Sequence, residues 1–352
     1  MVKVGTNVLT RADGRLDLTI ISNLVDQLAI LKQAGVEVVL VSSGAVGAAR
    51  SLFSDLHKMN KVVRRQLLSS VGQTRLLQVY QTFLEHHGLF CAQVLATKED
   101  FRDRQHYLNM KNCLLALMRP DILPIINEND VISIDELMFT DNDELAAWIA
   151  SMVGAEALFV LTNVDGIFTG HPDHPDSELL QSIDPDDASV FQYIAPNKSS
   201  FGRGGMATKF RTAQRVAKLG ISTYILNGKK WDSLQLLWNG ELEKYTQVTA
   251  KKDVSNIKKW IAFNERASTG KVYINPGAET ALSDPQTVNS LLPVGITTVD
   301  GHFEKGDLIE LYNAQKELIG KGIAQYDSLL AQERIGKTGH KPLVHYDHLF
   351  LE

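Results

Sequence analysis

The sequence contains little cysteine, no long hydrophobic run and no surplus of basic charge. Its two cysteines, Cys91 and Cys113, lie apart from any CxxC or Cys/His cluster. This predicts free buried thiols in a reducing compartment, with a disulfide as the lesser alternative. No stretch approaches the roughly 18 apolar residues of a membrane helix, and the first residues, MVKVGTNVLT, lack a signal-peptide core. We therefore expect a cytoplasmic protein without a membrane partner, and the net charge of −5 argues against nucleic acid as the main partner.

Length and hydrophobic patterning predict two domains. A chain of 352 residues exceeds the usual size of a single core. Strand-like and helical segments alternate up to residue 228, which predicts an α/β domain with a mostly parallel sheet. After a polar linker, short strand-like runs at residues 271–274, 297–299 and 308–312 predict a small, mainly β domain. We expect the two domains to cover residues 1–250 and 251–352.

Individual elements of the α/β domain follow from the spacing of apolar residues. The expected helices cover residues 16–34, 65–84, 109–117 and 144–153, with a further helix after Lys209. The expected strands cover residues 2–9 (interrupted by Gly5), 36–41, 90–95, 122–126, 157–161 and 221–226. Residues 168–200 are rich in His, Pro, Asp and Ser, and we expect them to form a loop.

Polar side chains cluster directly after one predicted strand. The apolar run Ile122–Ile126 ends in the polar group Asn127–Asp130, and a second polar group, Thr140–Asp143, precedes a predicted helix. In parallel sheets the ligand crevice lies at the carboxyl ends of the strands. The stretch therefore predicts a ligand site; two ordinary polar turns joined by a loop are the alternative.

Two lysines and several glycine-containing segments point to phosphate chemistry. Lys3 lies beside Gly5 on the first strand, and Ser42–Gly47 is a small-residue turn between a strand and a helix. Lys209 ends the glycine-rich segment Gly202–Lys209. Backbone N–H groups of such turns approach phosphate oxygens, and lysines neutralise a transferring phosphoryl group. The segment has neither the GxxxxGK[ST] spacing nor a GxGxxG after a strand, and ligand-free glycine turns are the alternative.

Seven motifs occur in a fixed order along the chain. They are VKVGTNVLT, VSSGAVGAAR, QLLSSVGQTRL, INENDVI, DNDELAA, LTNVDGIF and GRGGMATK. In this order they resemble the glutamate 5-kinase family of the amino acid kinase superfamily over residues 2–230, and the C-terminal part resembles a PUA domain. The resemblance implies an α/β fold, a three-layer αβα sandwich with a mostly parallel sheet. It also implies a substrate half at about 1–153 and a nucleotide half at about 154–250.

The resemblance further implies roles for individual residues. The implied catalytic residues are Lys3 and Lys209, which stabilise the transferring phosphoryl group, and Asp143, which organises the two lysines. The residues implied to bind the amino acid are Ser43, Gly44, Asp130 and Asn142. The residues implied to bind ATP are Lys3, Thr162, Asn163, Arg203, Gly204, Gly205, Met206, Ala207, Thr208 and Lys209. Mg²⁺ is implied with ATP, held mostly by phosphates and water rather than by protein ligands.

Three positions depart from the family pattern. Thr140 stands where Gly is usual, Asn163 where Asp is common, and Arg203 where Thr is common. Relatives also usually carry several more residues before the lysine that matches Lys3. None of these differences removes a catalytic group, and the Thr140 difference bears on the conformation of its loop and on sensitivity to proline.

The implied reaction is ATP-dependent phosphorylation of the γ-carboxylate of L-glutamate to L-glutamyl 5-phosphate, the first step of proline biosynthesis. A γ-carboxylate is already ionised at neutral pH, so the reaction needs no strong base. The implied partners are L-glutamate, proline as a feedback inhibitor, further copies of the chain in a dimer or tetramer, and a glutamyl phosphate reductase that receives the product.

Two alternative functions remain open at the level of sequence. Another kinase of the superfamily, acting on aspartate or N-acetylglutamate, would share several motifs, although DNDELAA and the PUA-like part favour the glutamate branch. An RNA-binding protein led by the C-terminal part is the alternative from another class. Residues 251–352 carry 12 Lys and Arg against 13 Asp and Glu, and this near neutrality counts against RNA binding.

Overall fold

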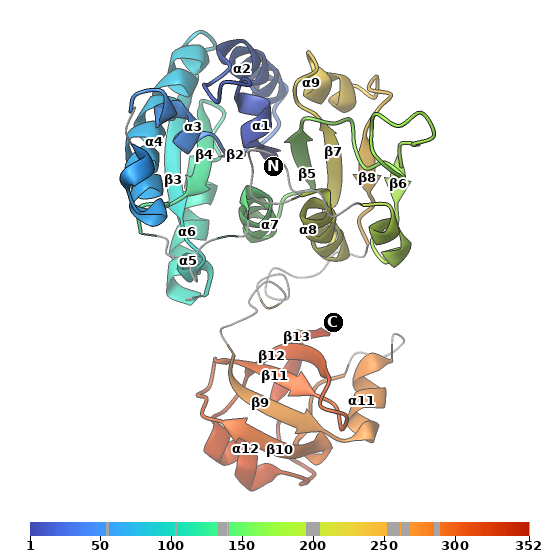
Figure 1. The fold of residues 1–352 in the computed structure, drawn as a ribbon. Coiled ribbons are helices and arrows are strands. Elements are labelled where there is room, and N and C mark those ends of the chain that lie inside the picture. Colours follow the sequence, from blue (N-terminus) through green and yellow to red (C-terminus); the bar gives the residue numbers. More distant parts are fainter. Residues whose placement is uncertain are drawn as a thin grey trace. The chain divides into compact units, whose positions relative to one another are not determined.

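The computed structural model describes residues 1–53, 56–102, 104–132, 139, 141–194, 205–251, 261, 268–284 and 289–351. The chain divides into two compact units, Met1–Asp253 and Val254–Glu352 (Figure 1). Each unit has its own sheet and its own hydrophobic core. None of the helices within the described ranges has the length and apolarity that a membrane crossing requires.

The first unit contains an eight-stranded sheet with the strand order β3-β4-β2-β1-β5-β7-β8-β6. The strands are β1 Val2–Val4, β2 Leu40–Ser42, β3 Phe90–Ala96, β4 Ile122–Glu128, β5 Ala157–Thr162, β6 Ser182–Ile183, β7 Ser222–Asn227 and β8 Thr246–Val248. Neighbouring strands pair in parallel except β7 and β8, which are antiparallel. β1 pairs with both β2 and β5, so the first residues of the chain lie in the middle of the sheet.

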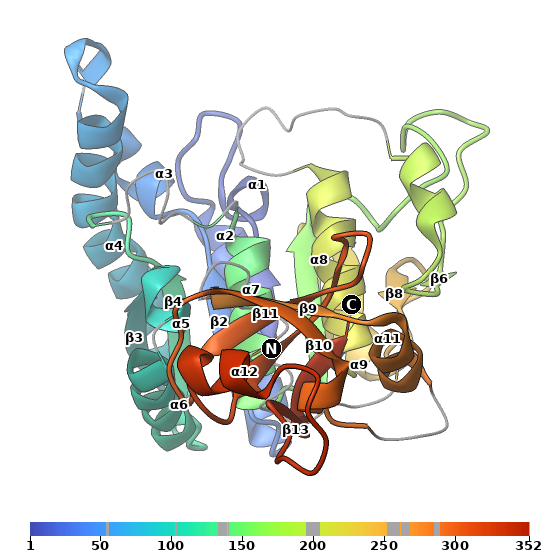
Figure 2. The ribbon, with the colours of Figure 1, turned by 90° about the horizontal axis from the view of Figure 1, so that it is seen from below.

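Helices cover both faces of this sheet. They are α1 Thr6–Leu9, α2 Leu18–Gln33, α3 Ala45–Arg50, α4 Lys61–Glu85, α5 Glu99–Arg102, α6 Arg104–Leu117, α7 Asn142–Val153, α8 Met206–Lys218 and α9 Ser233–Trp238. Figure 1 shows α2 and α9 on one side of the sheet and α7 and α8 on the other, and Figure 2 shows α7 and α8 side by side. The predicted three-layer αβα sandwich with a mostly parallel sheet is confirmed.

Side-chain alternation along β1 separates the core from the functional face. Val2 and Val4 belong to the core that packs against α2, α4 and α9. Successive side chains of a strand point to opposite faces. Lys3 therefore points to the face that α7 and α8 cover.

Two strand predictions near the N-terminus are wrong in part. The strand-like run at residues 2–9 forms a strand only up to Val4, because the chain turns at Gly5 and its carbonyl accepts the N–H groups of Val8 and Leu9 in the helical turn α1. The run at residues 36–41 forms a strand only from Leu40, because the short β1 offers partners in register with Leu40–Ser42. The other predicted strands are present, with ends shifted by at most three residues.

The segment predicted as a loop, residues 168–200, contains more regular structure than expected within its described part. β6 pairs in parallel with β8, and residues Ala188–Gln192 form a 3₁₀ helix. The side chain of Asp187 accepts the N–H of Ser189 and begins this helix. The composition of the segment gives no sign of so short a strand, because its pairing partner lies more than 60 residues away.

Capping residues set the ends of the helices that matter most for the site. The Asp17 side chain accepts the backbone N–H of Thr19 at the start of α2, and Gly35 follows its end with a φ of 83°. The Asp141 side chain caps α7, which ends at Gly154 with a φ of 70°. Aspartate before the first turn and glycine after the last are the favoured caps.

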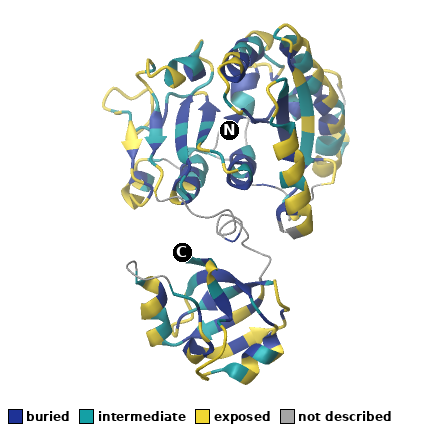
Figure 3. Ribbon diagram, turned by 180° about the vertical axis from the view of Figure 1, so that it is seen from behind, coloured by how far each residue is buried: buried dark blue, intermediate teal, exposed yellow. Residues whose placement is uncertain are grey.

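The second unit contains a five-stranded sheet with the order β10-β9-β11-β12-β13. The strands are β9 Ser268–Ile274, β10 Ile296–Gly301, β11 Leu308–Tyr312, β12 Leu318–Ala324 and β13 Val344–Leu351, and the helices are α11 Pro276–Ser283 and α12 Ser328–Arg334. β9 and β11 are parallel and the other pairs antiparallel. Val272, Phe303 and Leu343 lie in the core of this unit, and Figure 3 shows buried residues along the strands of both sheets. The mainly β character predicted for the C-terminal part is confirmed.

Helix α4 touches α3 without a side chain between the two backbones. A Cβ atom at Gly72 would lie 1.7 Å from the carbonyl oxygen of Ala45, far inside contact distance. Ala45 begins α3 and follows Gly44, whose φ of 102° belongs to the left-handed region that favours glycine. The turn that leads from β2 into α3 therefore depends on the missing side chain at Gly72.

Replacing Gly72 by alanine should force α3 away from α4 and lower the free energy of unfolding by about 3 kcal/mol or more, the upper end for overpacked cores. Denaturant unfolding measures this change. Gly277→Ala is the control, because an added Cβ in α11 would meet nothing closer than 3.4 Å. Equal and small effects of both substitutions would show that α3 is free to move.

Candidate active site

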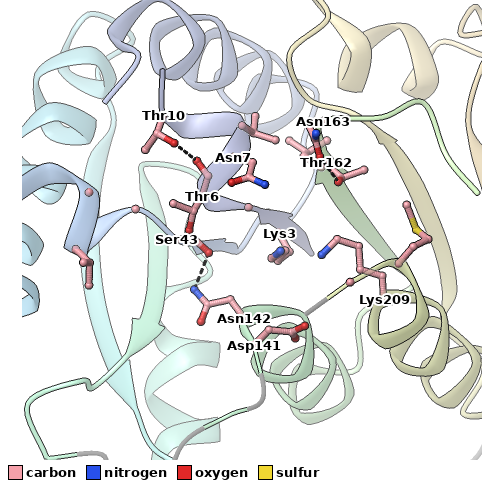
Figure 4. A pocket seen from close by; sticks show the side chains of 18 of the residues that line it. Lys3, Thr6, Asn7, Thr10, Ser43, Asp141, Asn142, Thr162, Asn163 and Lys209 are labelled. Atoms are coloured by element: carbon pink, nitrogen blue, oxygen red, sulfur yellow. Dashed lines mark hydrogen bonds between the residues drawn. The ribbon is translucent and has the colours of Figure 1, made fainter. Parts of the chain in front are cut away.

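A cavity of about 710 Å³ lies at the carboxyl ends of the central strands of the first unit. Residues that follow these strands line it, namely Gly5 and Thr6 after β1, Ser43 and Gly44 after β2, Asp130 after β4 and Asn163 after β5 (Figure 4). Parallel strands deliver their carboxyl ends to one edge of a sheet, which is where open α/β proteins bind ligands. Segments far apart in the sequence therefore meet in one cavity.

A buried carboxylate holds two lysines together in this cavity. Asp143, in the first turn of α7, is 1% exposed. Its Oδ1 lies 2.6 Å from Nζ of Lys3, and its Oδ2 lies 2.6 Å from Nζ of Lys209. Both lysines line the cavity, and Figure 4 shows their side chains approaching each other from β1 and α8. The three residues predicted to be catalytic thus form one cluster.

The ion pairs within this cluster determine how its members titrate. Burial raises the pKa of Asp143, but the charges of Lys209 and Lys3 outweigh burial and hold this pKa well below its ordinary value. Burial lowers the pKa of Lys209, but Asp143 outweighs burial there and the pKa lies above its ordinary value. For Lys3, burial prevails over the attraction of Asp143 and lowers the pKa. Asp143 is therefore ionised at neutral pH and serves as a fixed negative charge.

Asp141 also lines the cavity, although the sequence assigns it no role. Its Oδ1 accepts the backbone N–H groups of Asp143 and Glu144 at 2.9 and 3.1 Å and so caps α7. Its Oδ2 is buried and has no hydrogen-bond partner among the described residues. Burial and the neighbouring charge of Asp143 raise the pKa of Asp141 to about 7. The available signal was its position directly before an apolar helical pattern, where aspartate acts as a cap.

Asn142 connects two strand ends at one end of the cavity. Its Nδ2 donates to Oγ of Ser43 at 2.9 Å (Figure 4). The same atom donates to Oδ1 of Asn127 at 3.0 Å and to the carbonyl oxygen of Ser42 at 3.2 Å. Ser43 and Asn142, both predicted to bind the amino acid, are thereby brought into contact. Asn127 is an additional cavity residue, which stands in the polar group already noted in the sequence.

Asp130 has partners within the protein on both carboxylate oxygens. Arg65, on α4, pairs with its Oδ1, and Oγ of Ser69 donates to its Oδ2 at 2.9 Å. Nη2 of Arg65 also donates to Oε2 of Glu128 at 2.9 Å. A ligand ammonium group at Asp130 would therefore share the carboxylate with a guanidinium. Arg65 and Ser69 escaped prediction because the apolar spacing of a helix does not show which of its polar residues face a cavity.

Residues from β5 and α8 line the other end of the cavity. Thr162, Asn163, Gly205 and Met206 lie there together with Lys209. Gly205 is the N-cap of α8, and none of the described side chains caps this helix. Its first N–H groups lack partners within the helix and favour an anion.

The other residues predicted to bind the nucleotide are not among the described residues that line the cavity. Ala207 and Thr208 belong to the first turn of α8, but the described lining of the cavity does not include them. Arg203, Gly204 and Thr140 lie outside the described residues. Among the residues that are described, no group of three or more His, Cys, Asp or Glu is arranged to hold a metal ion.

Replacing Asp141 by asparagine should stabilise the ligand-free protein at high pH and not at low pH. The pKa of the carboxyl group is raised to about 7 in the folded state from its ordinary value of 3.8. The group therefore favours folding below the lower value and loses this contribution as the pH rises through 7. Asparagine keeps the capping oxygen and does not titrate. By calorimetry the variant should melt at least about 3 °C above wild type at pH 8, the shift produced by about 1 kcal/mol, with the difference vanishing near pH 4.

The exposed Asp173 provides the control for this titration, because its side chain is 92% exposed. Asp173→Asn should melt like wild type at pH 8. An Asp141→Asn effect that does not change with pH would contradict the raised pKa.

Residues 1–227 match the amino acid kinase family, and residues 270–345 match the PUA domain. The chain is 46% identical over 353 residues to a glutamate 5-kinase of Bacteroides thetaiotaomicron, covering all of this chain and 98% of the relative. It is also 46% identical over 351 residues to a glutamate 5-kinase of Chlorobaculum tepidum, covering all of this chain and 96% of the relative. A glutamate 5-kinase of Thermoanaerobacter sp. is 37% identical over 97% of this chain and 91% of its own length. With this similarity over its full length, the chain belongs to the amino acid kinase family and, within it, to the glutamate 5-kinase family.

Proposed function

We propose that this protein transfers the γ-phosphoryl group of ATP to the γ-carboxylate of L-glutamate and forms L-glutamyl 5-phosphate and ADP. The observation that carries the proposal is the lysine pair held by Asp143 in a cavity whose other end is lined by Ser43 and Asn142. The relatives that match this chain over its full length are named glutamate 5-kinases, and these names support glutamate as the amino acid. The product would enter proline synthesis.

The lysine pair is suited to a phosphoryl group in transfer. Such a group carries negative charge on its equatorial oxygens, and catalysis consists mainly of positioning and charge stabilisation. One carboxylate at 2.6 Å from each Nζ atom fixes both ammonium groups before the reactants arrive. Prearranged charges need no reorganisation during the reaction, and this is the source of their effect.

The acceptor needs no general base from the protein. A glutamate γ-carboxylate has an ordinary pKa of about 4.3 and is an ionised nucleophile at neutral pH. Asp143 is the carboxylate nearest the lysines, but both of its oxygens are engaged by them. Its role in the proposal is to orient Lys3 and Lys209, which touch the transferring group.

The two ends of the cavity divide the substrates between them in this proposal. Ser43, Gly44, Asn142 and Asp130 hold the amino acid within the substrate half, residues 1–153. Their carboxylate and amide groups are complementary to an ammonium and a carboxylate group. The nucleotide is held within the half of residues 154–250, by Thr162 and Asn163 and by the segment 203–209, whose described residues begin α8.

Mg²⁺ belongs to the proposal as the partner of the nucleotide. This ion keeps several water ligands and binds mainly through substrate phosphates. It would reduce the negative charge on the nucleotide. The donor set fits this arrangement, because the most buried carboxylate of the site, Asp143, already has both oxygens paired with lysines.

Several further expectations from the family resemblance stay predictions. They are proline as a feedback inhibitor, a homodimer or homotetramer, transfer of the product to a glutamyl phosphate reductase, and a cytoplasmic location. Each needs a measurement of its own.

Purified protein supplied with L-glutamate, ATP and Mg²⁺ should form an acyl phosphate that hydroxylamine traps as a glutamyl hydroxamate. The assay is run in parallel with aspartate and N-acetylglutamate, which are expected to give little product. Turnover with one of these acceptors and none with glutamate would refute the assignment. Turnover with none of the three would refute the proposed reaction.

Replacing Lys209 by alanine should lower kcat by about 1000-fold, the effect of removing a charge that stabilises a transition state. The matched control is Lys218→Ala in the same helix, because Lys218 is exposed and pairs with Asp186 at the surface. The control should keep the wild-type kcat. A Lys209→Ala protein that is folded, as judged by its melting temperature, and retains most of its activity would show that this lysine does not act on the phosphoryl group.

A further inference from the structure

Glu128, the last residue of β4, is a buried carboxylate that binds two different parts of the site. It is 4% exposed and lines the cavity. Its Oε1 accepts the backbone N–H of Phe139 at 2.9 Å, and its Oε2 accepts Nη2 of Arg65 at 2.9 Å. A carboxylate withdrawn from water costs free energy unless such donors compensate it. Each carboxylate oxygen of Glu128 therefore has a donor that compensates for its burial.

The contact through Oε1 fixes Phe139, which lies shortly before α7 in the sequence. Phe139 is 1% exposed, and its ring packs edge-to-face on Phe101 with 5.7 Å between centroids. Phe101 packs in turn on Trp148, with 4.9 Å between centroids. Trp148 belongs to α7 itself. Phe139 is thus held at its backbone by Glu128 and at its ring by an aromatic cluster that includes Trp148 of α7.

The position of Phe139 restricts the catalytic end of the cavity. Asp141, the N-cap of α7, follows after two residues, which span at most about 7 Å. The next two residues, Asn142 and Asp143, carry the contacts to Ser43 and to the lysine pair. A displacement at Phe139 would therefore be transmitted to the carboxylate that orients both lysines.

The connection through Oε2 fixes the amino acid end of the cavity. Arg65 bridges Glu128 and Asp130 through the same Nη2 atom. Two further side chains of α4 contact residues that follow β4. Oγ of Ser69 donates to Asp130 at 2.9 Å, and Nε2 of Gln66 donates to the carbonyl oxygen of Val131 at 2.7 Å. Arg65 thus ties the position of Asp130 to that of Glu128.

We propose that Glu128 is a positioning residue that couples the two ends of the cavity, fixing Asp130 through Arg65 and the start of α7 through Phe139. The inference rests on the proposed function, in which Asp130 holds the amino acid and Asp143 orients the lysines that touch the transferring phosphoryl group. A contribution to the stability of the fold alone is the competing explanation. The two contacts can be separated by substitution, since each uses a different oxygen.

Two substitutions of Glu128 test the coupling in the hydroxamate assay. Glu128→Ala removes both contacts and should lower kcat by about 100-fold, the cost of a misplacement of about 1 Å. Glu128→Gln keeps an oxygen for the Phe139 N–H but places an amide against Arg65. It should retain kcat within about threefold and raise the KM for glutamate by about tenfold, the loss of one charge-assisted hydrogen bond. The KM for ATP should stay unchanged in Glu128→Gln, which keeps the contact to Phe139 and so leaves the lysine pair in place.

Glu156→Ala is the control, because Glu156 is an exposed residue of the same unit and should leave kcat and both KM values unchanged. Glu128 variants that melt earlier but keep kcat and KM per folded molecule would overturn the proposal. If Glu128→Ala does not fold, the isosteric Glu128→Gln decides, and an unchanged KM for glutamate then overturns it. A wild-type protein without activity overturns the proposed function as well, whereas an active wild type with unaffected variants overturns only the coupling.

Discussion

The charge of Asp143 is the constraint on which the first unit depends. A carboxylate buried this deeply is tolerated only with opposite charges close by. The fold supplies two such charges, Lys3 from β1 and Lys209 from α8. Lys3 reaches it because β1 lies in the centre of the sheet and alternation turns this side chain away from the core. Lys209 reaches it because α8 packs beside α7. Strand order, helix packing and the placement of the cavity are therefore linked through a single negative charge.

Two aspartates at the start of α7 respond to burial in opposite ways. The pKa of Asp143 is held low by two lysines, whereas the pKa of Asp141 is raised because burial and the neighbouring carboxylate act on it more strongly than the lysines do. Environments that drive the pKa values of neighbouring groups apart are typical of active sites. The pair gives the site one permanent negative charge and one that depends on pH near neutrality.

Much of this arrangement could be predicted from the sequence, and the exceptions have physical causes. Alternating strand and helix patterns indicated an α/β fold with a mostly parallel sheet, and the polar groups after β2, β4 and β5 indicated the edge where ligands bind. The family resemblance identified Lys3, Lys209 and Asp143, whose contact no periodicity would reveal. Arg65 and Glu128 were missed because their roles depend on the particular hydrogen bonds that their side chains form. Such pairings depend on the approach of α4 to β4, and residue spacing along either element does not contain that information.

The central place of β1 also affects how the chain folds while it is being synthesised. β1 pairs with β2 on one side and with β5 on the other, and β5 leaves the ribosome more than 150 residues later. Until then β1 presents an unpaired strand edge, which is prone to aggregate. Contacts between such distant segments form slowly. The nascent chain is therefore most prone to aggregation between completion of β2 and arrival of β5, when chaperones would bind its exposed strand edge.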